Sequence, residues 1–234
     1  MKVVVPKQQT TSGKTEYLPL VPDKDLDTVT KENSIGFTLK TNPTNANSTT
    51  YKMSARILVG GETARVLIRW KQDVQRVCAG LAANTVQDRI PIAETLMRDT
   101  PLMLFQGRMQ ELAQEAFDEA LQAAANNNQR NAINANGVDH YQHIDHFELA
   151  LQFVLQNLMR KNILQYVKRH VRCECRKPKD MKVRIYLQHL ICINTEEIPS
   201  LPPFNEDQSL GPDELVDILL HGTKRWIDSA LRKK

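Results

Sequence analysis

The distribution of helix-breaking residues limits what this chain can fold into. No proline occurs between Pro101 and Pro178, and no glycine occurs from Val138 to Leu210. Because proline and glycine are the residues that most disfavour a helix interior, long segments without them favour helices. The sequence therefore predicts a mostly α fold, and 41% hydrophobic residues among 234 are typical of a globular chain with its own core.

Strand spacing appears only near the front of the chain. From Tyr51 to Val59, apolar residues alternate with mostly polar ones, which predicts a short strand that ends at Gly60-Gly61. Residues 1–33 are polar and poor in aromatic residues, and we interpret them as an extended or mobile arm. Residues 41–50 are interpreted as a linker by composition. A short strand or hairpin is thus expected before the helices.

Apolar residues then recur at intervals of three and four, which predicts amphipathic helices. We expect these helices at about 62–83, 102–124, 146–159, 161–172, 180–194 and 212–221, with a short last helix around Trp226. Trp70 and Tyr186 lie on the apolar stripes of their helices, and both are predicted to be buried in different lobes.

Local residue patterns also predict where helices begin and end. Thr85 and Asp88 indicate a cap for a short helix that Pro91 interrupts or restarts, and Asp145-His146-Phe147-Glu148 indicates a capping box. Gly222 is expected to follow the end of the helix that begins at Pro212. The tract 126–136 contains six asparagines. It is predicted to be a loop, because asparagine side chains compete for backbone hydrogen bonds.

The sequence contains none of the common signatures of catalysis. The chain has no phosphate-binding loop, no dinucleotide fingerprint and no nucleophile elbow. His140, His143 and His146 are spaced for a metal on one side of a helix, but solvated histidines at a capped helix start are the more common case. Cys173 and Cys175 are closer together than zinc ligand pairs usually are. We expect no enzyme activity, metal, cofactor or small-molecule substrate.

The chain carries no apolar segment of membrane-spanning length. Its longest unbroken apolar run is four residues, whereas a transmembrane helix needs roughly 20. Three valines before Pro6 make too short an apolar region for a secretory signal. We expect no membrane association, a cytoplasmic location, and four cysteines that stay reduced.

Charge is unevenly distributed along the second half of the chain. Between Arg160 and Arg184 there are ten basic residues against Glu174 and Asp180, a local charge of +8. From Ile185 to Thr223 there is no lysine or arginine, and seven acidic residues occur. Such a basic stretch is often only a solvated face, but it also suits RNA phosphates or an acidic protein surface. The two opposite stretches can pair within one fold or between copies.

Several segments carry a resemblance to a known family. Residues 176–190, 201–204 and 210–219, together with 37–43 and 61–65 near Trp70, resemble the Gag polyprotein of long-terminal-repeat retrotransposons. The likeness is closest to Gag-like proteins of algal and stramenopile genomes, and it extends over most of residues 35–231.

This resemblance implies a retrotransposon-type capsid with two helical lobes. Residues 1–50 would be the arm and linker, 51–160 the N-terminal lobe, and 161–234 the C-terminal lobe. Residues 176–190 would be the counterpart of the major homology region. In that segment Met181, Tyr186, Leu187 and Leu190 match the apolar positions that hold the lobe together. Lys177, Asp180 and Arg184 stand where the family has different polar residues, so the internal hydrogen bonds are expected to differ.

The resemblance also implies a structural function. A Gag capsid protein assembles through pentamers and hexamers into a virus-like particle that encloses RNA. The alternative is a helical RNA-binding or adaptor protein, such as a domesticated Gag, that does not assemble. The candidate contacts to nucleic acid or to a neighbouring subunit are basic: Lys168, Arg169, Arg172, Arg176 and Lys177.

Overall fold

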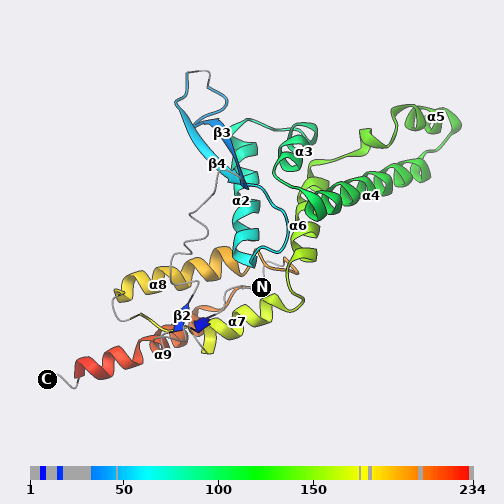
Figure 1. Cartoon of the computed structure of the whole chain (residues 1–234). Coiled ribbons are helices and arrows are strands. Elements are labelled where there is room, and N and C mark those ends of the chain that lie inside the picture. Colours follow the sequence, from blue (N-terminus) through cyan, green and yellow to red (C-terminus); the bar gives the residue numbers. More distant parts are fainter. Residues whose placement is uncertain are drawn as a thin grey trace. The chain divides into compact units, whose positions relative to one another are not determined.

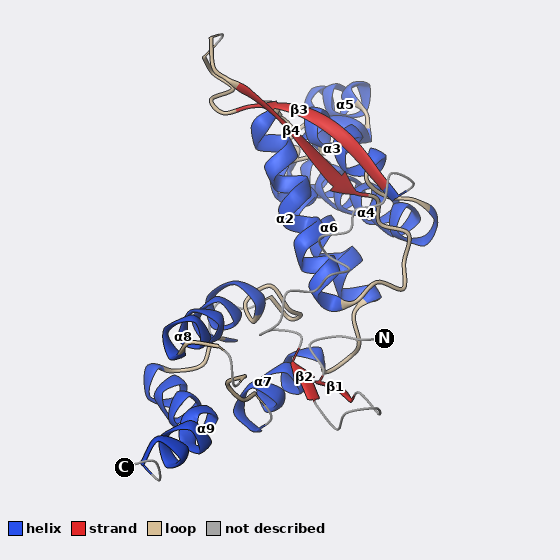
Figure 2. Ribbon diagram, turned by 60° about the vertical axis from the view of Figure 1, so that its left-hand side comes forward, coloured by secondary structure: helices blue, strands red, loops and turns tan. Residues whose placement is uncertain are grey.

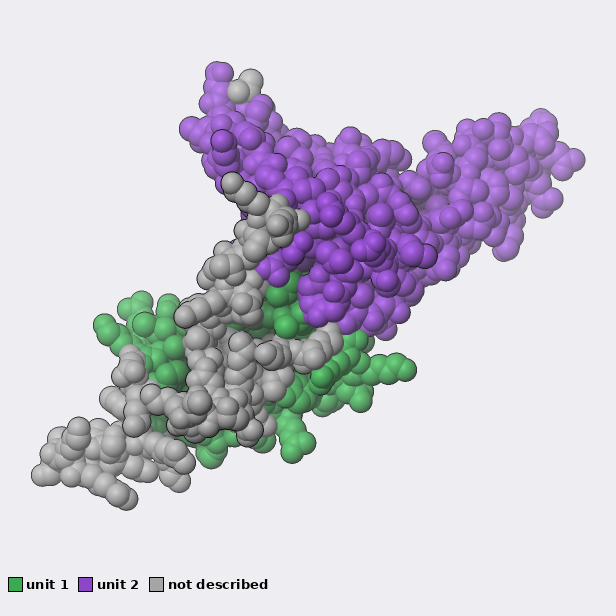
Figure 3. All heavy atoms as spheres, viewed as in Figure 1, with its two compact units in different colours: residues 1–28, 63–68, 159–234 green, residues 29–62, 69–158 purple. Residues whose placement is uncertain are grey.

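The computed structural model describes residues 6–8, 15–17, 33–45, 47–173, 175–178, 181–204 and 208–231, with side chains described from 33 to 223 within these ranges. These residues are mostly helical, with two separate pairs of antiparallel strands (Figure 1), which confirms the predicted mostly α class. The chain divides into two compact units, coloured separately in Figure 3. Unit 1 comprises Met1–Thr28, Thr63–Ile68 and Met159–Lys234, and unit 2 comprises Val29–Glu62 and Arg69–Leu158.

The division falls between Leu158 and Met159, next to the predicted boundary at residue 160. Unit 2 departs from the predicted lobe 51–160 in two respects, because it already begins at Val29 and because residues 63–68 group with unit 1. Within unit 1, Arg65 Nε lies 3.3 Å from Glu197 Oε1. The periodicity of the sequence does not predict such a contact, because the two residues lie far apart in the chain.

A β-hairpin begins unit 2. Strand β3 (Ser34–Lys40) pairs antiparallel with β4 (Thr50–Arg56), with Ser34 opposite Arg56 and Lys40 opposite Thr50 (Figure 2). The prediction that residues 1–50 are only an arm and linker is therefore wrong for 34–50. Thr41 N–H donates to Thr49 C=O at 2.9 Å, so the polar 41–50 segment is a hairpin loop rather than a linker between parts.

The hairpin packs closely on helix α2 (Ala64–Gly80). Leu39 is fully buried, and a Cβ added to Gly80 would lie 2.9 Å from the Cβ of Leu39. Trp70 on the same helix is 1% exposed, which confirms its predicted burial. Its indole N–H donates to Leu96 C=O at 3.0 Å, so its polar edge is satisfied in the core.

Helix α3 (Val86–Thr95) begins as predicted. Thr85 accepts a hydrogen bond from Asp88 N–H, and Asp88 accepts from Thr85 N–H, which completes a capping box. The expected interruption at Pro91 is wrong, because Pro91 lies inside the helix. A proline there removes one backbone hydrogen bond. Capping of the first turn and the buried Val86 and Ala93 favour the helix despite that loss.

Two longer helices complete the core of unit 2. Helix α4 (Asp99–Ala123) packs on α6 (Ile144–Leu158), with the rings of Phe105 and Phe147 edge to face and their centroids 5.8 Å apart. Both phenylalanines are fully buried. The predicted helices 102–124 and 146–159 correspond to these two within a few residues.

The start of α6 differs from the predicted capping box. Asp145 lies inside the helix, and the N–H of His143 donates instead to His146 Nδ1 at 3.4 Å. Glu148 Oε2 lies 3.5 Å from Lys71 Nζ of α2. The glutamate is thus used to join two helices rather than to cap its own.

The asparagine-rich tract is a helix, contrary to the prediction of a loop. Helix α5 (Asn127–Asn136) begins where the side chain of Asn126 accepts from Gln129 N–H at 2.9 Å. Asparagine is a good N-cap for the same reason that it is a poor interior residue. The helix has no buried residue and ends at Gly137, whose φ is +73°. A 3-10 helix, η2 (Val138–Tyr141), follows.

Unit 1 contains strands β1 (Pro6–Gln8) and β2 (Thr15–Tyr17), which pair antiparallel. Its helices are α7 (Ile163–Cys173), α8 (Val183–Cys192), the π-helix η3 (Ile193–Glu197) and α9 (Pro212–Leu231). The two strands lie within the predicted arm 1–33, and the other residues of that arm up to 32 lie outside the described part. Among the described helices, none combines the length and hydropathy needed to cross a bilayer.

Helix α9 corrects the prediction that Gly222 ends one helix and that another forms around Trp226. The helix is continuous from Pro212 to Leu231. A Cβ on Gly222 would lie 2.1 Å from Tyr186 Oη. Gly222 therefore lies against Tyr186 of α8 and is not a helix terminator.

Candidate nucleic-acid or inter-subunit interface

Helix α7 separates apolar and basic side chains onto opposite sides. Its buried residues recur at three and four: Ile163, Val167, His170 and Val171. Arg169 and Arg172 fall on the other side of the helix and are exposed. The first part of the basic stretch 160–184 thus includes the outer face of the amphipathic helix α7.

Arg172 is paired within the chain. Its Nε donates to Glu214 Oε1 near the start of α9. The side chains are 45% and 34% exposed, so we expect the pair to add only about 0–1 kcal/mol to stability. The basic and acidic stretches therefore meet, at this point, inside one fold.

Arg176 and Lys177 also make contacts within unit 1. Arg176 Nη1 donates to Cys175 C=O at 2.9 Å, and its Nη2 lies 2.6 Å from His221 Nε2. Lys177 Nζ donates to the carbonyl groups of Pro178 at 2.9 Å and Met181 at 2.8 Å. These two side chains are half-buried, and their contacts tie down the segment between α7 and α8.

Lys168 and Arg169 complete the five predicted basic residues. Lys168 is half-buried and Arg169 is exposed, and in the part of the chain that the structure describes neither makes an ion pair.

Tyr166, 39% exposed, lies one turn before Arg169 on the same helix. An exposed aromatic ring next to an arginine suits base stacking. Sequence analysis missed Tyr166, although its spacing of three from Arg169 was available as a signal.

The segment 176–190 contributes to the core of unit 1. Tyr186 and Leu190 are buried, which confirms the prediction for Tyr186, while Met181 and Leu187 are half-buried. Tyr186 Oη donates to Cys175 C=O at 3.4 Å. Of the three departures from the family pattern, Lys177 makes the contacts above, Arg184 is exposed, and Asp180 lies outside the described residues.

The backbone before α8 joins three helices. Cys175 N–H donates to His170 C=O of α7 at 3.0 Å, and Lys177 N–H donates to Gly222 C=O of α9 at 3.2 Å. Because the Tyr186 hydroxyl of α8 donates to Cys175 C=O, helices α7, α8 and α9 all contact residues 175–177. The segment therefore holds the basic outer face of α7 in a fixed position relative to α8 and α9.

Glu197 is a buried carboxylate that sequence analysis missed. It lies at the end of the π-helix η3, is 8% exposed, and one of its oxygens, Oε2, has no hydrogen-bond partner among the described residues. Burial raises the pKa of this carboxyl above its ordinary value of 4.5, and the nearby Arg65 only partly opposes that effect. The sequence does not predict the burial of Glu197, because the neighbouring Glu196 has the same side chain and is exposed.

We expect Glu197→Gln to raise the thermal unfolding midpoint at pH 7. The pKa of this carboxyl is raised in the folded state, so its protonated form stabilises the fold below the ordinary pKa of 4.5. This contribution is lost as the pH rises through the pKa of the folded state. The glutamine variant should therefore gain stability at pH 7 and lose this advantage at pH 4. The matched control is Glu196→Gln, which removes the same charge from the exposed neighbour and should change the midpoint little. A lower midpoint for Glu197→Gln at pH 7 would show that the pair with Arg65 outweighs burial.

The histidines and cysteines take separate positions. His140 is in η2, His143 precedes α6, and the pKa of His146 is lowered, first of all by burial. Burial raises the pKa of the Cys78 thiol to about 11, which keeps it protonated at neutral pH. Cys175 is buried whereas Cys173 is exposed. Among the described residues, no three His, Cys, Asp or Glu side chains are placed to hold a metal.

Comparison with known proteins adds no family to this description. The chain matches no protein-family model, no curated protein and no solved structure.

Proposed function

We propose that this chain is a Gag capsid protein of the long-terminal-repeat retrotransposon type, which self-assembles into a cytoplasmic virus-like particle around RNA. The resemblance of residues 176–190 to the family supports this proposal, and so does the position of Tyr186 and Leu190 in the core of unit 1. Two compact units divided at Leu158 and Met159 are compatible with a two-lobe capsid. In this proposal the chain has a structural function and no catalytic step.

An exposed apolar pair on α9 carries the proposal of self-association. Val216 and Leu220 are 53% and 55% exposed, and their spacing of four places them on the same side of the helix. Exposed apolar residues that are adjacent mark interaction surfaces more often than scattered ones do. We infer that a second copy of the chain covers them.

Replacing both residues with serine, Val216→Ser and Leu220→Ser, should abolish assembly while leaving the helical circular dichroism unchanged. The wild-type chain should form large, regular particles, visible by electron microscopy and sedimentation, under at least one combination of salt and RNA. Met103→Ser is the matched control, because Met103 is 73% exposed but lies on α4. A wild-type chain that stays monomeric under every condition would overturn the capsid proposal.

The alternative function, RNA binding without assembly, is favoured by one observation, the exposed Tyr166 beside Arg169. Both functions use the outer face of α7, so RNA binding alone does not separate them. An assay that finds RNA bound by single copies, with no particles, would select the alternative.

RNA binding should depend on the basic residues that, within the described structure, have no partner on α9. Changing Lys168 and Arg169 to glutamine should lower the slope of log affinity against log salt by about 0.7 for each phosphate of a single strand that the variant no longer neutralises. Arg172→Gln with Arg176→Gln is the control of similar chemistry, since Glu214 and His221 already contact those side chains. Filter binding at several salt concentrations measures the slopes, and equal slopes for both variants would contradict the assignment.

A further inference from the structure

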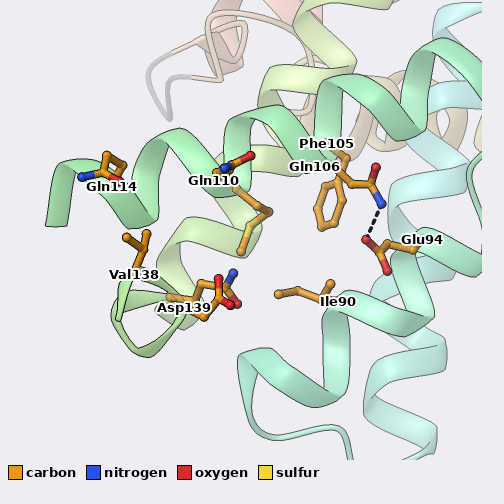
Figure 4. Close-up of a pocket in the computed structure, with 10 residues that line it drawn as sticks. Ile90, Glu94, Phe105, Gln106, Gln110, Gln114, Val138 and Asp139 are labelled. Carbon is orange, nitrogen blue, oxygen red and sulfur yellow. Dashed lines mark hydrogen bonds between the residues drawn. The ribbon is translucent and has the colours of Figure 1, made fainter. Parts of the chain in front are cut away.

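A pocket in unit 2 lies outside the basic interface. It has a volume of about 270 Å³ and is formed by α3, α4 and η2 (Figure 4). Pockets for drug-sized ligands usually measure about 300–1,000 Å³. The volume therefore suits one long side chain better than a cofactor.

Part of this pocket is apolar. The half-buried Ile90 of α3 and Val138 of η2 expose apolar surface to it, and the buried Phe105 and Met109 of α4 lie behind. Figure 4 shows Phe105 and Ile90 facing the same space from different helices. A bound group with a hydrocarbon portion can therefore cover Ile90 and Val138.

The wall along α4 is made of amides. Gln106, Gln110 and Gln114 recur at every fourth residue and line the pocket, and all three are exposed. Their spacing follows one side of the helix, as Figure 4 shows. Amide groups both donate and accept hydrogen bonds, so such a row suits the peptide groups of an extended backbone.

The charges at the pocket are negative. Glu94 and Asp139 line it, and among the described residues no lysine or arginine does. Glu94 Oε1 accepts a hydrogen bond from Gln106 Nε2 at 2.7 Å, which fixes the carboxylate at the pocket wall. A cation is the complementary group for this wall. A guanidinium, with five donors in a planar fork, suits carboxylates and amides together better than a compact ammonium does.

We propose that this pocket binds an arginine side chain from an extended segment of a partner protein. The guanidinium lies between Glu94 and Asp139, and the methylene groups cover Ile90 and Val138. The glutamines of α4 hydrogen bond with the backbone of the bound segment. This inference does not depend on the capsid proposal.

The test titrates the full-length, ¹⁵N-labelled chain with the capped tripeptide Gly-Arg-Gly and follows amide resonances by NMR. Shifts should be confined to residues of α3, α4 and η2. The same peptide with citrulline in place of arginine is a neutral analogue of nearly equal shape, and we expect it to bind at least tenfold more weakly. Equal binding of the two peptides, or shifts mainly outside these elements, would overturn the proposal.

Variants separate the charge of the pocket from the general acidity of the chain. Glu94→Gln and Asp139→Asn keep the shape of each side chain, and together they should reduce arginine-peptide affinity at least tenfold. Glu119→Gln removes the same charge from α4 outside the pocket and should leave the affinity unchanged. If Glu119→Gln weakens binding as much as the pocket variants do, the attraction is non-specific and the proposal fails. Assembly measurements are independent of this outcome.

Discussion

Replacing Gly222 with alanine should destabilise unit 1 by about 3 kcal/mol, the upper end of the usual cost of overpacking. The added Cβ would lie 2.1 Å from Tyr186 Oη and 2.8 Å from Tyr186 Cζ. Tyr186 is fully buried, so its ring has little room to move away. Helix propensity alone predicts the opposite sign, because alanine is favoured over glycine in a helix by about 1 kcal/mol. Urea denaturation followed by circular dichroism measures the difference.

A second variant tests the cause of that destabilisation. Introducing Tyr186→Phe together with Gly222→Ala removes the atom nearest to the new Cβ, so alanine should cost clearly less in the phenylalanine background than in the wild type. Gly211→Ala is the matched control, since nothing lies within 4 Å of a Cβ at that position. A stabilising Gly222→Ala would show that α8 and α9 do not approach as closely as described.

Replacing Trp70 with alanine should destabilise unit 2 by about 3–5 kcal/mol, the usual cost for a large buried aromatic residue. Trp70 is 1% exposed, and its indole N–H joins α2 to Leu96, the residue that follows α3. Since whole domains are stable by only about 5–15 kcal/mol, this change should leave the unit close to unfolding. Hydrogen exchange should show reduced protection throughout residues 69–158.

Trp70→Phe is the graded control for this prediction. Phenylalanine keeps most of the apolar contact and removes the hydrogen bond to Leu96, so the stability of this variant should fall between those of the wild type and the alanine variant. Leu96 C=O would keep its second donor, Leu58 N–H at 2.9 Å. If both variants are as stable as the wild type, Trp70 is not a core residue of unit 2.

Local patterns predicted several features correctly because their cause is also local. Thr85 and Asp88 form a capping box with each other over three residues, and no other part of the chain is needed. Trp70 and Tyr186 lie on apolar stripes at helical spacing, and the burial of a stripe follows from its being apolar. Helices α4 and α6 follow from the same periodicity.

Predictions from residue type were wrong where one residue type can serve two structural purposes. The asparagines of 126–136 predicted a loop, yet Asn126 caps the helix that the others extend. The position of Gly222 predicted a helix end, and it is instead the small residue that lets Tyr186 approach α9. A glycine gives the same sequence signal in both cases, because only the neighbouring helix determines which property is used.

By itself, the sequence determined the mostly α class, the apolar stripes of the helices and the charge contrast between residues 160–184 and 185–223. Only the tertiary structure decided that the strand 50–56 pairs with 34–40, that Arg172 meets Glu214, and that Glu197 is buried beside Arg65. Helical spacing and capping depend on residues within four positions of each other. Pairing and burial depend instead on which distant segments come together, and similar side chains such as Glu196 and Glu197 differ only in what is packed around them.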